Sequence, residues 1–140
     1  MSPRKQTILC IDDDPHTTTL IAEDLAERNY TVIIAPDGIA GLTAIVLDRP
    51  DLVLCDINMP GITGFEVLEF VTTLAPQLEP VPFIFLTGRA DRKSELNGRR
   101  LGADDYLIKP IDFEILATII EARLGTGRRK GSGLPFRTRK

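Results

Sequence analysis

Charged side chains follow three apolar runs of this 140-residue chain, at the point where each run ends. They are Asp12 and Asp13 after the first run, Asp56 at the end of the second, and Lys109 after the third. Each run has the character of a buried strand, and the carboxyl ends of parallel strands meet at one edge of a sheet. We therefore expect three carboxylates and one ammonium to share a pocket. Because crowded carboxylates repel one another, the pattern predicts a hard divalent cation beside one reactive aspartate.

Asp56 is the hardest of these acids to explain as an ordinary surface residue. It follows a nearly continuous apolar run, so its carboxylate must be desolvated unless a cation pairs with it. Lys109 is the expected partner, and Pro110 after it allows a cis peptide bond. Thr87 ends a further apolar run, which lies between Asp56 and Lys109 in the sequence, and its hydroxyl could donate to an anion there. Taken singly, each residue also fits a plainer role, as a solvated strand end or a helix cap, so the prediction rests on their combination.

Strand-like and helix-like stretches alternate five times along the chain. Apolar and β-branched runs predict strands over 7–11, 31–35, 51–55, 81–86 and 105–108. Apolar periodicity and N-capping aspartates predict helices over 15–29, 37–48, 65–75, 91–101 and 112–124. Leu20, Ile21 and Leu25 are expected on the buried side of the first helix. Strict alternation implies an α/β fold, with a doubly wound parallel sheet covered by helices on both faces.

Length, charge and cysteine content restrict the class of protein. A chain of 140 residues suits one domain with a real core, and we find no internal repeat. Residues 1–124 hold 11 basic and 20 acidic residues, a net charge of −9, which argues against direct nucleic-acid binding by this domain. Cys10 and Cys55 lie in predicted strands without metal-ligand spacing, which favours buried, reduced thiols in a cytoplasmic protein. No apolar run approaches the roughly 20 residues of a membrane span.

The C-terminal segment differs in composition from the rest of the chain. Residues 125–140 hold six basic and no acidic side chains, with little apolar content. This composition favours a domain over 1–124 followed by a basic, disordered tail or linker. A contact between this tail and phosphates or a partner is the alternative.

In this order and spacing, the singled-out residues resemble the receiver domain of two-component response regulators. The resemblance rests on Asp12-Asp13, Asp56, Thr87-Gly88 and Lys109-Pro110, and it covers residues 7–124. The stretches Asn58-Met59-Pro60-Gly61 and Gly102-Ala103-Asp104-Asp105-Tyr106 fit the same family pattern. Each motif is weak alone, but the combination is highly specific. The resemblance implies a flavodoxin-like three-layer sandwich whose five parallel strands lie in the order 2-1-3-4-5.

The resemblance also implies roles for the acidic residues. Asp56 would be the phosphoacceptor, which attacks a phosphohistidine of a sensor histidine kinase or a histidine phosphotransfer protein. Asp13, Asp56 and the Asn58 backbone carbonyl would bind Mg²⁺ directly, with Mn²⁺ as an alternative, and Asp12 would hold metal-bound water. The residues themselves agree with this, since a carboxylate can carry a covalent phosphate and phosphoryl transfer needs charge neutralisation more than acid–base catalysis.

After transfer, Thr87 would hydrogen-bond one phosphoryl oxygen and Lys109 would pair with another. Phosphorylation adds about −1.5 to −2 charges, so Thr87 would move toward the phosphate and leave room for Tyr106 to turn inward. The surface of the last helix–strand–helix would then change and be recognised by a partner. Asn58 and Arg89, each two residues after a site residue, would tune how fast water removes the phosphate.

Two other classes of protein share parts of this pattern. A haloacid-dehalogenase-like phosphatase also uses an aspartate nucleophile and Mg²⁺, but His16 stands where its motif requires Thr or Val, and the chain lacks room for a substrate cap. A flavodoxin-like cofactor carrier would need a phosphate-binding loop rich in Ser, Thr or Gly after the first strand. We expect phosphotransfer and autodephosphorylation at Asp56, and not conventional enzymatic turnover.

The output pathway is not encoded in these motifs. The 16 residues after Leu124 are too few for a winged helix or an enzymatic module. The domain therefore either acts alone on a downstream protein, which is the preferred interpretation, or has lost an output domain. Charged residues on the last helix–strand–helix favour reciprocal pairs across a phosphorylation-dependent homodimer: Arg99, Asp104, Asp105, Glu121 and Arg123.

Overall fold

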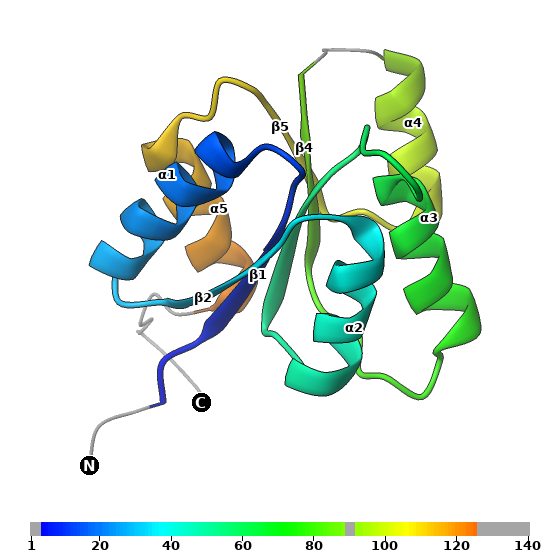
Figure 1. The fold of residues 1–140 in the computed structure, drawn as a ribbon, viewed down its shortest axis with the longest axis horizontal. Helices are drawn as coiled ribbons and strands as arrows, with labels where there is room; N and C mark the ends of the chain where they lie inside the picture. Colours follow the sequence, from blue (N-terminus) through cyan, green and yellow to red (C-terminus); the bar gives the residue numbers. More distant parts are fainter. Residues whose placement is uncertain (1–3, 89–91, 126–140) are drawn as a thin grey trace.

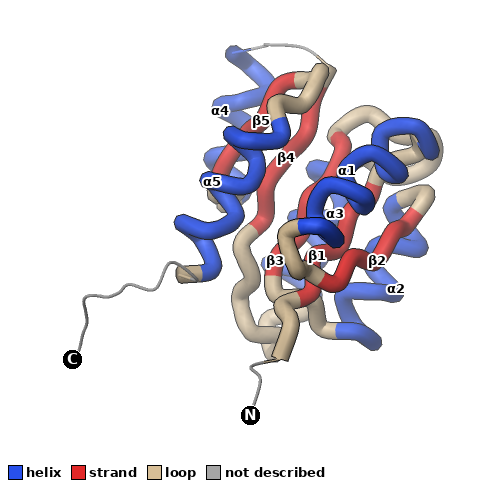
Figure 2. Tube along the Cα trace, turned by 90° about the vertical axis from the view of Figure 1, so that its left-hand side faces the viewer, coloured by secondary structure: helices blue, strands red, loops and turns tan. Residues whose placement is uncertain are grey.

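Five parallel strands form the sheet of the computed structural model, which describes residues 4–88 and 92–125. The strands are β1 (Thr7–Ile11), β2 (Thr31–Ala35), β3 (Leu52–Asp56), β4 (Phe83–Thr87) and β5 (Asp105–Ile108). They lie in the order β2-β1-β3-β4-β5, and every neighbouring pair is parallel. Figure 2 shows the sheet with β2 and β5 at its two edges. The predicted strand order is confirmed.

Helices cover both faces of this sheet. They are α1 (Pro15–Glu27), α2 (Gly38–Asp48), α3 (Gly64–Glu69) with its π-helical continuation η1 (Phe70–Leu74), α4 (Arg92–Leu101) and α5 (Phe113–Leu124). In Figure 1, α1 and α5 lie on one face, and α2, α3 and α4 lie on the other. This is the predicted three-layer, flavodoxin-like sandwich. Among the described residues, no helix has both the length and the apolar character needed to cross a membrane.

Aspartate side chains start three of the helices. Asp14, Asp37 and Asp112 each accept a hydrogen bond from a backbone N–H of the first turn that follows. Pro15 follows the first of these caps, where its missing N–H and fixed φ suit the first helical position. Each of these three helices therefore begins just beyond the carboxyl end of a strand, at the same edge of the sheet.

Two strands are shifted relative to the prediction. The third strand begins at Leu52 and not at Asp51, because the Asp51 carboxylate accepts the Thr7 N–H at 2.7 Å just before the ladder starts. The fourth begins at Phe83 and not at 81, because Pro82 has no N–H to donate to a neighbouring strand. Both shifts move the strand ends toward the carboxyl edge, so that Asp56 and Thr87 become the last strand residues.

The helix predicted over 65–75 is α-helical only as far as Glu69 and then widens into η1. Within it, the Thr72 hydroxyl donates to the carbonyls of Leu68 and Glu69 at 3.0 Å and 3.3 Å. A hydroxyl that binds these carbonyls competes with the regular i→i−4 hydrogen bonds, which is one cause of such a local change.

The expected burial of Leu20 is wrong. Its side chain is 41% exposed, whereas Ile21 and Leu25 are fully buried as expected. Thr18, Ile21 and Leu25 share one helix face at spacings of three and four residues, and Leu20 lies at the side of that face.

The sheet separates two apolar cores. Cys55 belongs to the core under α2 and α3, and Cys10 belongs to the core under α1 and α5. Both thiols are buried and free, as predicted. Because the two cores lie on opposite faces of the sheet, the two cysteines do not pair.

Phe85 is the centre of an aromatic cluster on the α2–α3–α4 face. Its ring is fully buried and contacts the rings of Phe65, Phe83 and Tyr106 edge-on, with ring centroids 5.2 to 5.5 Å apart. Such pairs contribute beyond the area they bury, by about 0.5–1.5 kcal/mol each. This one side chain therefore links α3, β4 and β5.

Truncation of this ring should be strongly destabilising. We expect Phe85→Ala to lower the free energy of unfolding by about 3–5 kcal/mol in urea denaturation, since it removes a buried ring and leaves a cavity. Phe70→Ala removes the same side chain from a site that is 38% exposed on η1 and should have a much smaller effect. Equal losses for the two variants would contradict the central role of Phe85.

Candidate functional site

The sheet brings the predicted site residues to its carboxyl edge. Asp56 ends β3 and Thr87 ends β4, while Asp12 and Lys109 directly follow β1 and β5. These strands are consecutive in the order β1-β3-β4-β5, so residues far apart in the sequence become neighbours. The Lys109 N–H donates to the Thr87 carbonyl at 2.7 Å, which extends the pairing of β4 and β5 to the site itself.

Lys109 lies between two of the carboxylates. Its Nζ atom is 2.8 Å from Asp12 Oδ2 and 3.5 Å from Asp56 Oδ2. The expected pairing with Asp56 is therefore present, but Asp12 is the nearer partner. The peptide bond between Lys109 and Pro110 is cis, as the sequence allowed.

Three carboxylates form a cluster that fits a metal ion. Oxygen atoms of Asp12, Asp13 and Asp56 all lie within 4.8 Å of one another. Asp12 is 1% exposed, and its buried Oδ2 faces the Lys109 ammonium at 2.8 Å. Asp13 is exposed to solvent and gives the cluster an open side. An all-oxygen donor set with access to water, in which three carboxylates face a single ammonium, suits a hard divalent cation.

Burial and charge change the proton affinities of the site. Burial, together with the nearby charge of Asp12, raises the pKa of Asp56 to about 6, although Lys109 and the Ile57 N–H oppose this shift. Burial alone would lower the pKa of Lys109, but its contacts with Asp12 and Asp56 outweigh burial and raise it. Lys109 therefore remains an ammonium, and the Asp56 carboxyl group has an unusually high proton affinity.

The loop after Asp56 is held against its backbone. The Gly64 N–H donates to the Ile57 carbonyl at 2.8 Å, which closes the loop on itself. A Cβ atom at Gly64 would overlap the Asp56 carbonyl oxygen and lie 3.0 Å from Ile57 Cα, so only glycine permits this approach. Asn58 is exposed in this loop, two residues after Asp56. The role of Gly64 was missed from the sequence, where it was visible only as a loop residue.

Thr87 and Tyr106 lie on the same face of the sheet. Thr87 is buried and lies two residues beyond Phe85 on β4, and Tyr106 is the register partner of Phe85 on β5. The Tyr106 hydroxyl donates to the Ser94 carbonyl of α4 at 2.5 Å. Tyr106 is thus partly buried against α4, at the side of the same aromatic cluster. Arg89, the other predicted tuning residue, lies outside the described residues.

The buried thiols do not join the chemistry of the site. Burial, assisted by Asp12, raises the pKa of Cys10 to about 12, and burial raises the pKa of Cys55 well above its usual value. The thiolate is the reactive form of cysteine, so both groups are inert near neutral pH.

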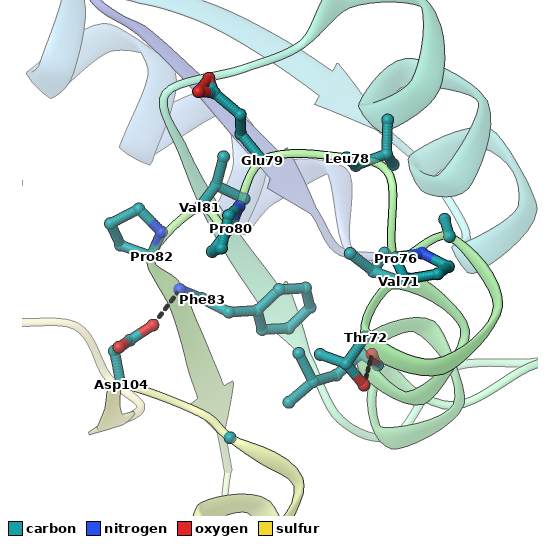
Figure 3. Close-up of a pocket in the computed structure, with 13 residues that line it drawn as sticks. Val71, Thr72, Pro76, Leu78, Glu79, Pro80, Val81, Pro82, Phe83 and Asp104 are labelled. Carbon is teal, nitrogen blue, oxygen red and sulfur yellow. Dashed lines mark hydrogen bonds between the residues drawn. The ribbon is translucent and has the colours of Figure 1, made fainter.

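A pocket of about 520 Å³ lies at the amino end of β4, away from the carboxyl ends of the strands. Figure 3 shows its lining, which is mostly aliphatic and proline side chains of η1 and the loop before Phe83. Asp104 is one of its few charged residues, and its carboxylate already accepts the Phe83 N–H at 2.8 Å. The groups that could perform chemistry lie at the carboxyl edge, so we place the functional site there.

The raised pKa of Asp56 gives a prediction for stability. Because the folded-state pKa of about 6 exceeds the usual 3.8, ionisation of Asp56 opposes folding. The stabilising effect of the protonated form is complete below pH 3.8 and is lost as the pH rises through 6. With chelator present, Asp56→Asn should therefore be more stable than the unmodified protein at pH 7.5, by about 1–2 kcal/mol, and this difference should shrink toward pH 4.

Urea denaturation at several pH values measures this difference. Asp48→Asn removes an exposed carboxylate at the end of α2 and controls for the loss of one negative charge. A pH-independent difference between Asp56→Asn and the unmodified protein would contradict the assigned cause.

Comparisons with known proteins place the chain in a family. Residues 8–121 match the family of the response regulator receiver domain. The chain is 34% identical to the transcriptional regulatory protein AfsQ1 of Streptomyces coelicolor over 90% of its own length and 54% of that regulator's length. It is 36% identical to a probable cyclic di-GMP phosphodiesterase of Vibrio cholerae over 89% of its own length and 28% of that protein's length. The chain thus spans about half the length of AfsQ1 and a smaller share of the length of the phosphodiesterase.

Solved structures agree with this assignment. The fold is similar to that of the chemotaxis protein CheY4 of Vibrio cholerae, with a TM-score of 0.81 and 28% sequence identity over 86% of this chain and all of that one. Neither the family match nor these relatives support the phosphatase alternative. The protein belongs to the response regulator receiver domain family of two-component signalling systems.

Proposed function

We propose that Asp56 is the phosphoacceptor of this receiver domain. The observation that carries the proposal is the position of its carboxylate, which is buried, next to two further carboxylates and 3.5 Å from the Lys109 ammonium. In the proposed step, an Asp56 carboxylate oxygen forms a bond to the phosphorus of a phosphohistidine as the phosphorus–nitrogen bond breaks. The products are an aspartyl phosphate and a free histidine on the donor protein.

The same proposal assigns a metal site to the acidic cluster. Asp13, Asp56 and the Asn58 backbone carbonyl would bind Mg²⁺ directly, with Mn²⁺ as an alternative, and Asp12 would hold metal-bound water. This assignment is supported by the all-oxygen donor set and by the excess of three carboxylates over one ammonium. When bound, the cation would neutralise negative charge on the carboxylates and the phosphoryl group.

The remaining site residues would hold and release the phosphoryl group. Lys109 already lies beside Asp12 and Asp56, from where it could pair with a phosphoryl oxygen. Thr87, at the end of the adjacent strand, would hydrogen-bond another oxygen and thereby couple the site to Tyr106. Asn58 is exposed beside the site, where its side chain could control the access of water. We retain Arg89 as a second tuning residue.

We extend the family assignment to domain boundaries and partners. We propose a receiver domain over 1–124, a basic linker or tail over 125–140, and a cytoplasmic sensor histidine kinase or histidine phosphotransfer protein as donor. The relatives include a transcriptional regulator and a probable phosphodiesterase, so the signal could pass either to an attached output domain or to a separate protein. We propose that the receiver domain itself binds neither a membrane nor nucleic acid directly.

The predicted homodimer would require an exchange of ion pairs. Arg123 pairs with Asp105 at 2.8 Å, and Arg99 pairs with Glu95 at 3.0 Å, both within one chain. Reciprocal pairs across a dimer would have to replace these contacts. The phosphorylation-dependent dimer therefore remains a prediction, and sedimentation with and without beryllofluoride would test it.

Replacement of the acceptor provides the direct test. Incubation with Mg²⁺ and acetyl phosphate should add one phosphoryl group to the unmodified protein, as read by intact mass, and Asp56→Asn should reduce labelling to background. Asp48→Asn should label normally. Undiminished labelling of Asp56→Asn would overturn the proposal, and free turnover of phosphate esters by the unmodified protein would favour a phosphatase.

Removal of the ammonium should make the domain depend on the cation. Lys109→Met leaves the Asp12 and Asp56 carboxylates without their positive partner, and we expect a loss of about 1–3 kcal/mol at pH 7.5 in chelator. Mg²⁺ should then raise the melting temperature of this variant more than that of the unmodified protein. Lys5→Met, which removes an exposed charge near the other end of β1, serves as the control. An equal effect of Mg²⁺ on all three proteins would contradict the charge-balancing role of Lys109.

A further inference from the structure

The hydroxyl group of Tyr106 contacts the backbone of helix α4. The Tyr106 hydroxyl on β5 donates to the Ser94 carbonyl at 2.5 Å. In an α-helix, this carbonyl lies in the same turn as the N–H of residue 98. The phenol ring also contacts Phe85 edge-on, with the ring centroids 5.5 Å apart. Tyr106 therefore lies between the aromatic cluster of the sheet and one particular turn of α4.

The place that the phenol occupies exists because residue 98 has no side chain. A Cβ atom at Gly98 would overlap the Tyr106 hydroxyl and would lie 2.7 Å from Cζ and 2.8 Å from Cε1. These distances are far below ordinary carbon contacts, and the conflict is with the hydroxyl oxygen and two ring atoms of a phenol that Phe85 also confines. Gly98 is buried, although its neighbours Asn97 and Arg99 are exposed. Any other residue at this position would exclude this placement of Tyr106.

Glycine at this position is unfavourable for the helix itself. Gly98 lies in the interior of α4, where glycine is among the poorest helix-forming residues. The rest of α4 is polar and places few side chains in the apolar cores. Glycine at this position weakens the helix, and the contact that compensates for this in the structure is the one between the Gly98 backbone and the Tyr106 phenol.

The space beside the Gly98 backbone that the phenol occupies, which we call the seat, connects α4 to the proposed phosphorylation site. Thr87, Phe85 and Tyr106 lie on one face of β4 and β5, with Phe85 and Tyr106 in register. A movement of Thr87 would therefore displace the contact between Phe85 and Tyr106. The Tyr106 phenol would in turn displace the backbone of α4. Without the seat, Tyr106 would still lie on β5 but would have no hydrogen bond to this helix.

We propose that Gly98 is a positioning residue for Tyr106: it forms a backbone seat on α4 in which the phenol donates to the Ser94 carbonyl and links β5 to the helix. This inference rests on the proposed function for its role in signalling. The seat itself is a property of the folded domain, and it can be tested without phosphorylation.

The first test compares Gly98→Ala in two backgrounds by urea denaturation. In a Tyr106→Ala background the seat is empty, so alanine should raise the urea midpoint by improving helix propensity. With Tyr106 present, the methyl group should displace the phenol, and the midpoint should fall or stay unchanged. A rise of similar size in both backgrounds would overturn the proposal. Asn97→Ala, at the exposed neighbouring position, should behave alike in both backgrounds.

The second test follows the phenol directly. The chain has two tyrosines, so Tyr30→Phe leaves Tyr106 as the sole ultraviolet-titrating phenol. Burial raises the pKa of Tyr106, with a further contribution from Glu95, while the Gly98 N–H and Arg99 oppose the shift. In Gly98→Ala this pKa should return toward its usual value of about 10, and in Asn97→Ala it should not change. An unchanged titration in Gly98→Ala would overturn the proposal.

Acetyl phosphate labelling of the same variants separates the two proposals. Absence of labelling at Asp56 in the unmodified protein would overturn the proposed function and would leave both Tyr106 measurements interpretable. Conversely, normal labelling with no change at Tyr106 in Gly98→Ala would retain the proposed function and reject the seat. Labelling of Gly98→Ala together with a displaced phenol would support both proposals.

Discussion

The ion pairs of Lys109 with Asp12 and Asp56 are the interaction on which the site depends. A parallel sheet directs the carboxyl ends of its strands to one edge, and here that edge collects three carboxylates within 4.8 Å. Buried like charges repel strongly, and the cost falls only when an opposite charge lies among them. The lysine after β5 supplies this charge at 2.8 Å and 3.5 Å. It neutralises only part of the cluster, which leaves an excess of negative charge that could hold a further cation.

The position of this site also explains why the rest of the fold can respond to it. Asp56 and Thr87 end adjacent strands, and Thr87 shares a sheet face with Phe85 and Tyr106. Phe85 is fully buried and packs against rings from α3, β4 and β5, which makes this region closely packed. Closely packed side chains transmit a displacement, because few voids are present to absorb it. The contact of Tyr106 with α4 is where this packing reaches a polar, weakly anchored helix.

Other parts of the chain hold the site without joining its chemistry. Gly64 lies against the Asp56 backbone and fixes the loop that contains Asn58. Arg123 ties the end of α5 to Asp105 at the start of β5, far from the carboxyl edge. Such contacts fix the scaffold, and the relatives that match this scaffold include a transcriptional regulatory protein and a probable cyclic di-GMP phosphodiesterase. One fold can therefore occur in proteins of different function, and function has to be argued from the site.

The sequence by itself determined the alternation of elements, the strand-end positions of Asp56 and Thr87, and the acidic and basic groups that had to meet. These follow from local patterns, because apolar runs, capping aspartates and charge at strand ends are readable over a few residues. Only the tertiary structure decided that Lys109 lies nearer to Asp12 than to Asp56, that Leu20 is exposed, and that Gly64 and Gly98 accept close neighbours. These features depend on distances between segments that are remote in the sequence. The presence of a glycine in the sequence does not indicate which atom of the folded chain will lie against it.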